Sequence, residues 1–325
     1  MKKKVILYTS IPKNELDRLR EHFDVTVFNQ LNDANRAEFN TALVEAHGII
    51  GSGVVMSDEL LDTAPYLKAV STISVGIDQF GFEYLSQRKI ALMHTPGVLN
   101  ETVADTVILL ALGTARRAVE VSNMVREGGW DRNLPAEYFG VDLHHKKMGI
   151  VGMGRIGYAV AKRAHLGFGM SICYHNRSAN LEAERDFAAQ RLELNELLST
   201  CDFVVALVPL SAATEKMFGK EQFELMKSSA IFVNAARGKV VDESALIEAL
   251  QNKTIRAAGL DVFEVEPLPA SSPLNKLDNA LLLPHIGSAT TETRYKMVQC
   301  AVDNIIAALN GDYSANCANK AQIES

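Results

Sequence analysis

The chain has 325 residues, 47% of them hydrophobic and 22% charged, with a net charge of −6. Its length corresponds to two domains at roughly 150 residues each, and this composition excludes a disordered or fibrous protein. The acidic balance argues against nucleic-acid binding, which usually needs a basic face. No apolar run approaches the roughly 18 residues of a spanning helix, and the run after Lys4 is too short for a signal peptide. The four cysteines are scattered without a CxxC motif, which indicates reduced thiols in a cytoplasmic protein.

Short β-branched runs alternate with helical stretches along the chain, which predicts mostly parallel sheets covered by helices. A helix is expected at 13–22, and the stretches 33–46, 57–63 and 79–88 are expected to be helical or turn-like. A long helix is expected from Asn100 to Val125, ended by Gly128-Gly129 and able to bridge two domains. A last helix is expected at 291–309, returning to the first domain. The expected strands are 4–8, 48–50, 69–72, 91–94, 147–151, 171–174, 203–207, 230–234, 257–260 and 280–283.

A glycine-rich turn follows the expected strand 147–151 directly and leads into a helical pattern. It contains Gly152, Gly154 and Gly157 in GxGxxG spacing, with Arg155 and Ile156 between them. The first glycine allows a tight turn, the second lets the backbone approach a pyrophosphate, and the third lets helix and strand pack closely. A helix N-terminus favours the anion. In this strand–turn–helix frame the motif predicts a dinucleotide site, with a ligand-free βα turn as the alternative.

The next expected strand ends where the adenosine ribose of a dinucleotide would lie. Sites that prefer NAD usually carry Asp or Glu there, but this chain has His175-Asn176-Arg177-Ser178, without an acid. Arg177 can form a fork with a 2′-phosphate and Ser178 can donate a hydrogen bond to it. We therefore predict NADPH as the preferred cofactor and NADH as the secondary one. The alternative is that Arg177 is only a solvated loop cation.

Three further polar stretches follow later expected strands, at the strand ends where open α/β sheets bind ligands. They are 233–238 with Arg237, 259–268 with Asp261 and Glu266, and 283–288 with His285. Each has a structural alternative. Arg237 could be a cation at a helix start, Asp261 a capping acid, Glu266 part of a turn, and His285 a core histidine.

Together these stretches resemble the D-isomer-specific 2-hydroxyacid dehydrogenases, over nearly the whole chain. The resemblance includes 74–78, 101–106, 149–157 and 209–214. It implies an α/β fold of two Rossmann-like parallel-sheet domains. The substrate domain, flavodoxin-like, would comprise 1–100 and 287–325, and the NAD(P)-binding Rossmann domain 101–286. Within the family, 144–146, 226–230 and 284–290 resemble the bacterial glyoxylate/hydroxypyruvate reductase B group, also called 2-ketogluconate reductases.

The resemblance assigns a role to each matching residue. Arg237 would bind the substrate carboxylate and polarise the ketone, His285 would protonate the carbonyl oxygen, and Glu266 would orient the imidazole and favour its charged form. Main-chain N–H groups of Val75 and Gly76 would also hold the carboxylate, although an ordinary tight turn is the alternative there. The positions implied to contact the cofactor are Thr106, Gly152, Gly154, Arg155, Ile156, Gly157, Asn176, Arg177, Ser178, Pro209, Ala235 and Asp261, with Asp261 near the nicotinamide carboxamide. No metal is implied, and His144-His145 is interpreted as a loop.

The resulting hypothesis is an NADPH-preferring reductase of small 2-keto acids, taking glyoxylate to glycolate and hydroxypyruvate to D-glycerate. One alternative keeps the mechanism but takes 2-keto-D-gluconate. A remote alternative is a dinucleotide-binding interaction scaffold, which the Arg237, Glu266 and His285 set disfavours. The resemblance also implies a homodimer, with Trp130 in the subunit contact, and no nucleic-acid or membrane partner.

Overall fold

The computed structural model describes residues 2–324, which form two compact units. Unit 1 contains the residues up to Leu99 and those from Thr290 onward, and unit 2 is Asn100–Ala289. The first division comes one residue earlier than the expected one, because Asn100 already begins a helix of unit 2. The second comes three residues later, and there the N–H of Gly287 donates to Asp261 of unit 2.

Unit 1 is built on a five-stranded sheet in which all neighbours are parallel, in the order β2-β1-β3-β4-β5. This is the flavodoxin-like order of a doubly wound sheet. β3 and β4 are buried at every residue, as inner parallel strands should be. The strands are β1 (Lys4–Leu7), β2 (Asp24–Val27), β3 (Gly48–Gly51), β4 (Ala69–Thr72) and β5 (Ala91–Met93). The helices are α1 (Lys13–His22), α2 (Arg36–Leu43), α3 (Asp58–Asp62), α4 (Phe82–Gln87), α12 (Thr291–Leu309) and α13 (Lys320–Ile323).

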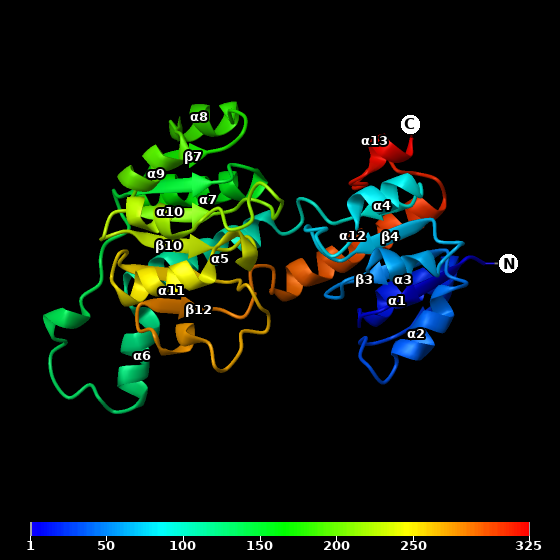
Figure 1. The fold of residues 1–325 in the computed structure, drawn as a ribbon, viewed down its shortest axis with the longest axis horizontal. Helices are drawn as coiled ribbons and strands as arrows, with labels where there is room; N and C mark the ends of the chain where they lie inside the picture. The colour runs from blue at the N-terminus through cyan, green and yellow to red at the C-terminus, as the bar shows by residue number, and fades with distance from the viewer. Residues whose placement is uncertain (1, 325) are drawn as a thin grey trace. The chain divides into compact units, whose positions relative to one another are not determined.

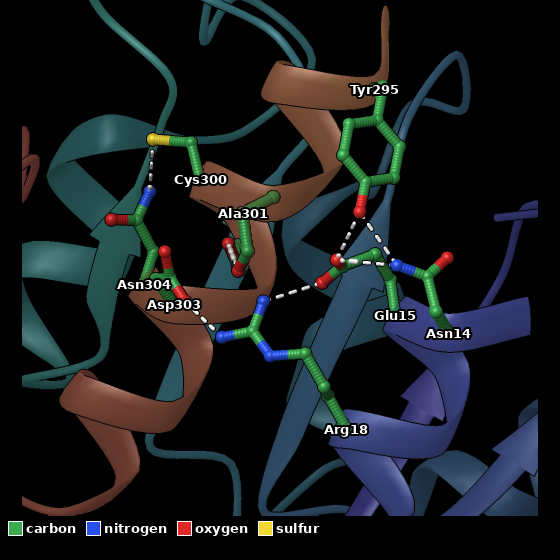
Figure 2. Close-up of polar contacts among 9 residues, drawn as sticks. Asn14, Glu15, Arg18, Tyr295, Cys300, Ala301, Asp303 and Asn304 are labelled. Carbon is green, nitrogen blue, oxygen red and sulfur yellow. Dashed lines mark hydrogen bonds and ion pairs between the residues drawn. The ribbon is translucent and has the colours of Figure 1, made fainter. Parts of the chain in front are cut away.

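The late helix α12 joins this first unit, as the sequence predicted. It packs against β3, β4, β5 and α1, and it occupies the bounds expected from the sequence. A polar cluster binds it to α1, as Figure 2 shows. The buried carboxylate of Glu15 accepts from Arg18 at 2.6 Å and from the Tyr295 hydroxyl at 3.2 Å. Arg18 also pairs with Asp303 of α12, so the buried charge is compensated and joins the two helices.

Unit 2 is built on a seven-stranded sheet, also parallel throughout, in the order β12-β11-β10-β9-β6-β7-β8. From strand β6 the chain proceeds to β7 and β8 on one side and then returns to β9 on the other side, which makes this the topological switch point where such sheets bind ligands. Its strands are β6 (Lys147–Val151), β7 (Ser171–His175), β8 (Gln190–Arg191), β9 (Phe203–Ala206), β10 (Ile231–Asn234), β11 (Ala257–Leu260) and β12 (Ala280–Leu282). Its α-helices are α5 (Asn100–Ala115), α6 (Ala118–Arg126), α7 (Arg155–Phe168), α8 (Leu181–Phe187), α9 (Leu194–Thr200), α10 (Lys220–Leu225) and α11 (Glu243–Gln251). Figure 1 shows α9, α10 and α11 stacked along one side of this unit. Three short 3₁₀ helices complete it, η1 (Ala136–Tyr138), η2 (Gly238–Val240) and η3 (Pro273–Lys276).

The prediction of one helix from Asn100 to Val125 is wrong. The helix ends at Ala115, and Arg117 takes a left-handed conformation with φ of 53° before α6 begins. The side chain of Arg117 stabilises this corner by donating to both carboxylate oxygens of Glu120. The carbonyl of Ala115 is turned to accept from Val141 of the returning chain. The end of α5 is therefore determined by a tertiary contact that leaves no glycine or proline signal.

Two edge strands were missed. β2 alternates between exposed and half-buried residues, and both residues of β8 are exposed, so neither has the apolar run that revealed the other strands. The remaining strands agree with the prediction to within one residue at each end. Between residues 2 and 324 no helix has both the length and the apolar character to cross a membrane.

Candidate active site

The glycine-rich turn joins β6 to α7 and is shaped as the motif requires. Gly152 has φ of 107°, and a Cβ on it would lie 2.7 Å from the backbone of Leu207, which directly follows β9, the neighbour of β6 in the sheet. A Cβ on Gly157 would lie 2.4 Å from the carbonyl oxygen of Gly152, so helix and turn touch there. Gly154, the N-cap of α7, has no atom within 4 Å of its Cβ position. The turn is thus close-packed behind and open in front of the helix N-terminus, which fits a pyrophosphate.

The segment after β7 is held to this turn. The side chain of Asn180 donates to the carbonyl of Met153 at 3.0 Å and caps α8 through the N–H of Ala183. His175 is the last residue of β7, and its ring contacts the carbonyl of Leu192 at 3.0 Å. Between these anchors, Asn176 is half-buried and both Arg177 and Ser178 are exposed. The residues expected at the ribose therefore form an accessible loop beside the glycine-rich turn.

The predicted substrate arginine follows β10 in a tightly organised loop. The buried amide of Asn234 accepts from the N–H of Ala236 and donates to the carbonyl of Arg237, both at 3.0 Å. A Cβ on Gly238 would lie 1.8 Å from the backbone of Phe263, so only glycine permits this close approach. These contacts hold the backbone of the half-buried Arg237 against the loop after β11.

Glu266 and His285 meet in unit 2. The Nδ1 atom of His285 lies 2.7 Å from Oε2 of Glu266, and Oε1 accepts from the N–H of Phe263 at 3.0 Å. Burial would raise the pKa of Glu266, but the hydrogen bonds from His285 and Phe263 and the charge of Arg237 lower it overall. The carboxyl is therefore ionised at neutral pH. With Nδ1 bound to the carboxylate, Nε2 is the ring nitrogen left for chemistry.

Asp261 fixes the segment that carries this histidine. It is 2% exposed, and its two oxygens accept from the N–H groups of Ile286 at 2.7 Å and Gly287 at 2.8 Å. His285 itself has φ of 52°, an uncommon backbone conformation that these two bonds help to hold. Burial raises the pKa of Asp261, against the two N–H bonds that lower it. The structure thus gives Asp261 a positioning contact that the sequence reasoning did not specify.

The remaining cofactor positions of unit 2 lie in or just after its elements. Thr106 is buried in α5 and its hydroxyl donates to the carbonyl of Thr102. Pro209 follows β9 and is exposed, while its carbonyl accepts from Thr214 at 2.6 Å. Ala235 directly follows β10 and is half-buried. At the glycine-rich turn, Arg155 is exposed and Ile156 is half-buried.

Val75 and Gly76 belong to unit 1, in the loop after β4. Three carbonyls of this loop are engaged: Ser74 accepts from the N–H of Thr95 at 2.9 Å, Val75 contacts Nδ1 of His94 at 2.9 Å, and Gly76 accepts from the Ser74 hydroxyl at 2.6 Å. The N–H and C=O of a trans peptide point in opposite directions. The N–H groups of Val75 and Gly76 are therefore turned away from these anchors, as carboxylate binding requires.

Sequence reasoning missed four residues that hold these loops: His94, Asn180, Arg191 and Asn234. His94, Asn180 and Arg191 bond to backbone atoms of another segment, so no motif spacing reveals them. Asn234 bonds within its own loop, to Ala236 and Arg237. The only available signal was the position of Asn234 and His94 at or just after the end of a strand.

The chain belongs to the D-isomer-specific 2-hydroxyacid dehydrogenase family. The model of that family's NAD-binding domain matches residues 108–287, which lie within unit 2. The protein is accordingly an NAD(P)-dependent 2-hydroxyacid dehydrogenase, with a fold of two parallel α/β sheets.

Its relatives extend over the whole chain. It is 54% identical to glyoxylate/hydroxypyruvate reductase B of Serratia proteamaculans over 319 residues, 98% of each chain. A solved protein from Thermus thermophilus superposes with a TM-score of 0.88 at 40% identity, covering 97% of this chain and 99% of that one. The NADPH-dependent glyoxylate/hydroxypyruvate reductase of Sinorhizobium meliloti, solved with NADP and malonate, gives 0.82 at 32% identity, covering 94% and 93%.

Proposed function

We propose that this protein is an NADPH-preferring reductase of small 2-keto acids, converting glyoxylate to glycolate and hydroxypyruvate to D-glycerate. The observation that carries the proposal is the 2.7 Å pair of His285 and Glu266, held by Asp261 in a unit with a dinucleotide turn. The name of the Serratia relative supports this substrate class.

Each residue of the set contributes to binding or to proton transfer in this reaction. When bound, NADPH supplies the hydride to the keto carbon. Arg237 binds the substrate carboxylate as a planar fork and polarises the ketone, and the N–H groups of Val75 and Gly76 bind the same carboxylate. His285 gives a proton from Nε2 to the carbonyl oxygen, and ionised Glu266 contacts Nδ1 and orients the ring so that Nε2 is free for this transfer. Asp261 holds the histidine's backbone and also belongs to the nicotinamide site.

The cofactor is bound along the carboxyl edge of the unit 2 sheet. Gly152, Gly154 and Gly157 with Arg155 and Ile156 take the pyrophosphate, while Thr106, Pro209 and Ala235 line the nicotinamide half. Asn176, Arg177 and Ser178 take the ribose and its 2′-phosphate, since no carboxylate among residues 175–178 would repel it.

The test is the initial rate of NADPH and NADH consumption with glyoxylate, hydroxypyruvate and 2-keto-D-gluconate. We expect NADPH to give the higher kcat/KM and the two small acids to exceed the sugar acid. Faster turnover with NADH would overturn the cofactor preference alone. A clear preference for 2-keto-D-gluconate would overturn the substrate assignment but keep the mechanism. Tight dinucleotide binding without turnover of any keto acid would favour a scaffold.

We also propose a homodimer in the cytoplasm. Free cysteines, two of them buried, suit a reducing compartment. Exposed apolar side chains on and after α6 support the dimer.

A further inference from the structure

Two carbonyl groups of the loop between β7 and α8 point toward the side chain of Arg191. Arg191 donates through Nε to the carbonyl of Asn176 at 3.1 Å and through Nη2 to the carbonyl of Arg177 at 2.8 Å. The side-chain amide of Asn176 donates to the carbonyl of Ser178 at 3.2 Å. Three consecutive carbonyls of the loop are thereby engaged from within unit 2.

The amide groups of the same peptides must point the other way. In each trans peptide the N–H is opposite the C=O, so the N–H groups of Arg177 and Ser178 face away from Arg191, and the N–H of Ala179 faces away from the side-chain amide of Asn176. Within residues 2–324 none of these three groups has a hydrogen-bond acceptor. Successive free main-chain amides on one side of a loop are a binding feature for anions.

The surroundings of this loop carry more positive than negative charge. Residues 175–178 contain no acid, and two of the three carboxylates of the following helix α8 are engaged elsewhere. Glu184 accepts from the Tyr174 hydroxyl at 2.5 Å, and Asp186 pairs with Arg185 and accepts from Tyr158. The third, Glu182, is exposed in the first turn of α8, so Arg177 and Arg191 outnumber it.

Arg191 is positioned for this task by the short strand β8. The strand pairs with β7 so that Arg191 lies opposite Tyr174, immediately before the loop. The ends of the loop are already tied by His175 to Leu192 and by Asn180 to Met153. The two hydrogen bonds from the Arg191 guanidinium, to the carbonyls of Asn176 and Arg177, hold the middle of the loop.

We propose that Arg191 is a specificity-determining positioning residue, which orients the loop so that the main-chain amides of Arg177 and Ser178 bind the 2′-phosphate of NADPH. This inference rests on the proposed preference for NADPH. The proposed function assigns the 2′-phosphate to the side chains of Arg177 and Ser178. The inference adds the main-chain amides as a second set of phosphate contacts, and Arg191 as the residue that orients them. A guanidinium is needed because its planar fork serves two carbonyls at once, which a lysine ammonium does not reproduce.

The test compares binding of 2′,5′-ADP and 5′-AMP by isothermal titration calorimetry, for wild type, Arg191→Ala and Arg191→Lys. These probes need no turnover, and they differ only in the 2′-phosphate. We expect Arg191→Ala to weaken 2′,5′-ADP roughly 10-fold or more and 5′-AMP less than about 3-fold, since hydrogen bonds to charged groups are the strong ones. Arg191→Lys should remain several-fold weaker for 2′,5′-ADP although it keeps the charge. In kinetics, the KM for NADPH should rise with little change in kcat.

Arg185→Ala is the matched control, because it removes an exposed cation of α8 that bonds to Asp186 and not to the loop carbonyls. It should keep the wild-type ratio of affinities. Wild-type affinity in Arg191→Lys would show that charge alone matters and overturn the positioning role. Equal loss of both ligands in Arg191→Ala would overturn the role at the 2′-phosphate. Equal affinity of the wild type for both ligands would instead overturn the NADPH preference, and the inference with it.

Discussion

At the scale of single residues, Glu266 is the proposed partner of the proton donor His285. Its pKa is lowered despite burial, so it is ionised at neutral pH and places a negative charge 2.7 Å from Nδ1 of the ring. We expect Glu266→Gln, which removes that charge, to lower kcat/KM for keto-acid reduction at neutral pH roughly 10²-fold or more, the usual scale of general acid catalysis. In the wild type, kcat/KM should fall as the pH drops through the lowered pKa of Glu266, and Glu266→Gln should lack this acid limb.

The measurement is the pH profile of kcat/KM with glyoxylate and NADPH. Glu264→Gln is the control, because Glu264 lies two residues away and does not bond to the histidine. An acid limb at the same pH in wild type and Glu266→Gln would contradict the role of this carboxylate.

His94 is expected to affect binding of the keto acid and not of the cofactor. Its ring contacts the carbonyl of Val75 at 2.9 Å, and the carbonyl of His94 accepts from the side-chain amide of Asn304 in α12 at 2.7 Å. Without the ring, the Val75–Gly76 peptide loses its anchor and the N–H of Gly76 loses its direction. We expect His94→Leu to raise the KM for the keto acid roughly 5-fold or more, the value of about one hydrogen bond. NADPH binding should be unchanged.

His94→Asn is the matched variant, since its amide can donate to the same carbonyl, and it should restore most of the affinity. Steady-state kinetics with varied keto acid, together with NADPH titration by fluorescence, provide both readouts. An unchanged KM in His94→Leu would show that the loop holds its shape without the ring.

At the scale of elements, the packing of α9 against the sheet depends on a glycine in β6. A Cβ on Gly149 would lie 2.5 Å from Cδ2 of Leu197 and 2.8 Å from Sγ of Cys201, both fully buried. We expect Gly149→Ala to lower the free energy of unfolding by about 1–3 kcal/mol through overpacking. Urea denaturation followed by circular dichroism measures it.

Gly167 is the contrasting position, in α7 and with no atom within 4 Å of its Cβ position. Gly167→Ala should be neutral or stabilise by about 0.5–1 kcal/mol, because alanine restricts the unfolded chain. Similar losses in both variants would mean that glycine matters here for flexibility and not for space.

The elements also show what the sequence could and could not predict. Buried strands such as β4 and β6 stand out because an inner parallel strand must be apolar on both faces. The break between α5 and α6 could not be found, since Arg117 takes its left-handed conformation through contacts with Glu120 and the returning chain. The candidate site divides in the same way. The glycine-rich turn is a local pattern, whereas the clamps by Asp261, His94 and Arg191 join segments distant in sequence or in different elements.

At the scale of the whole molecule, α6 is a helix that contacts α5 but buries none of its own residues. None of its nine residues is buried, and Val119 and Val125 are 51% and 54% exposed. The chain that follows exposes Trp130 at 64% and Phe139 at 59%. A short helix is marginal in water unless its apolar side is packed, and large exposed apolar side chains that gather in one segment mark an interface. We infer that this segment is covered by a second copy of the chain.

Sedimentation velocity at micromolar concentration tests this inference, and we expect the wild type at twice the chain mass of 35.5 kDa. Trp130→Asp and Phe139→Asp should each shift it toward the monomer, because a buried unpaired carboxylate costs several kcal/mol. Leu166→Asp is the control, since Leu166 is 66% exposed on α7, outside this segment, and should leave the dimer intact. Dimers that survive both substitutions would place the interface on another face, and α6 would then need a different partner to explain its exposed valines.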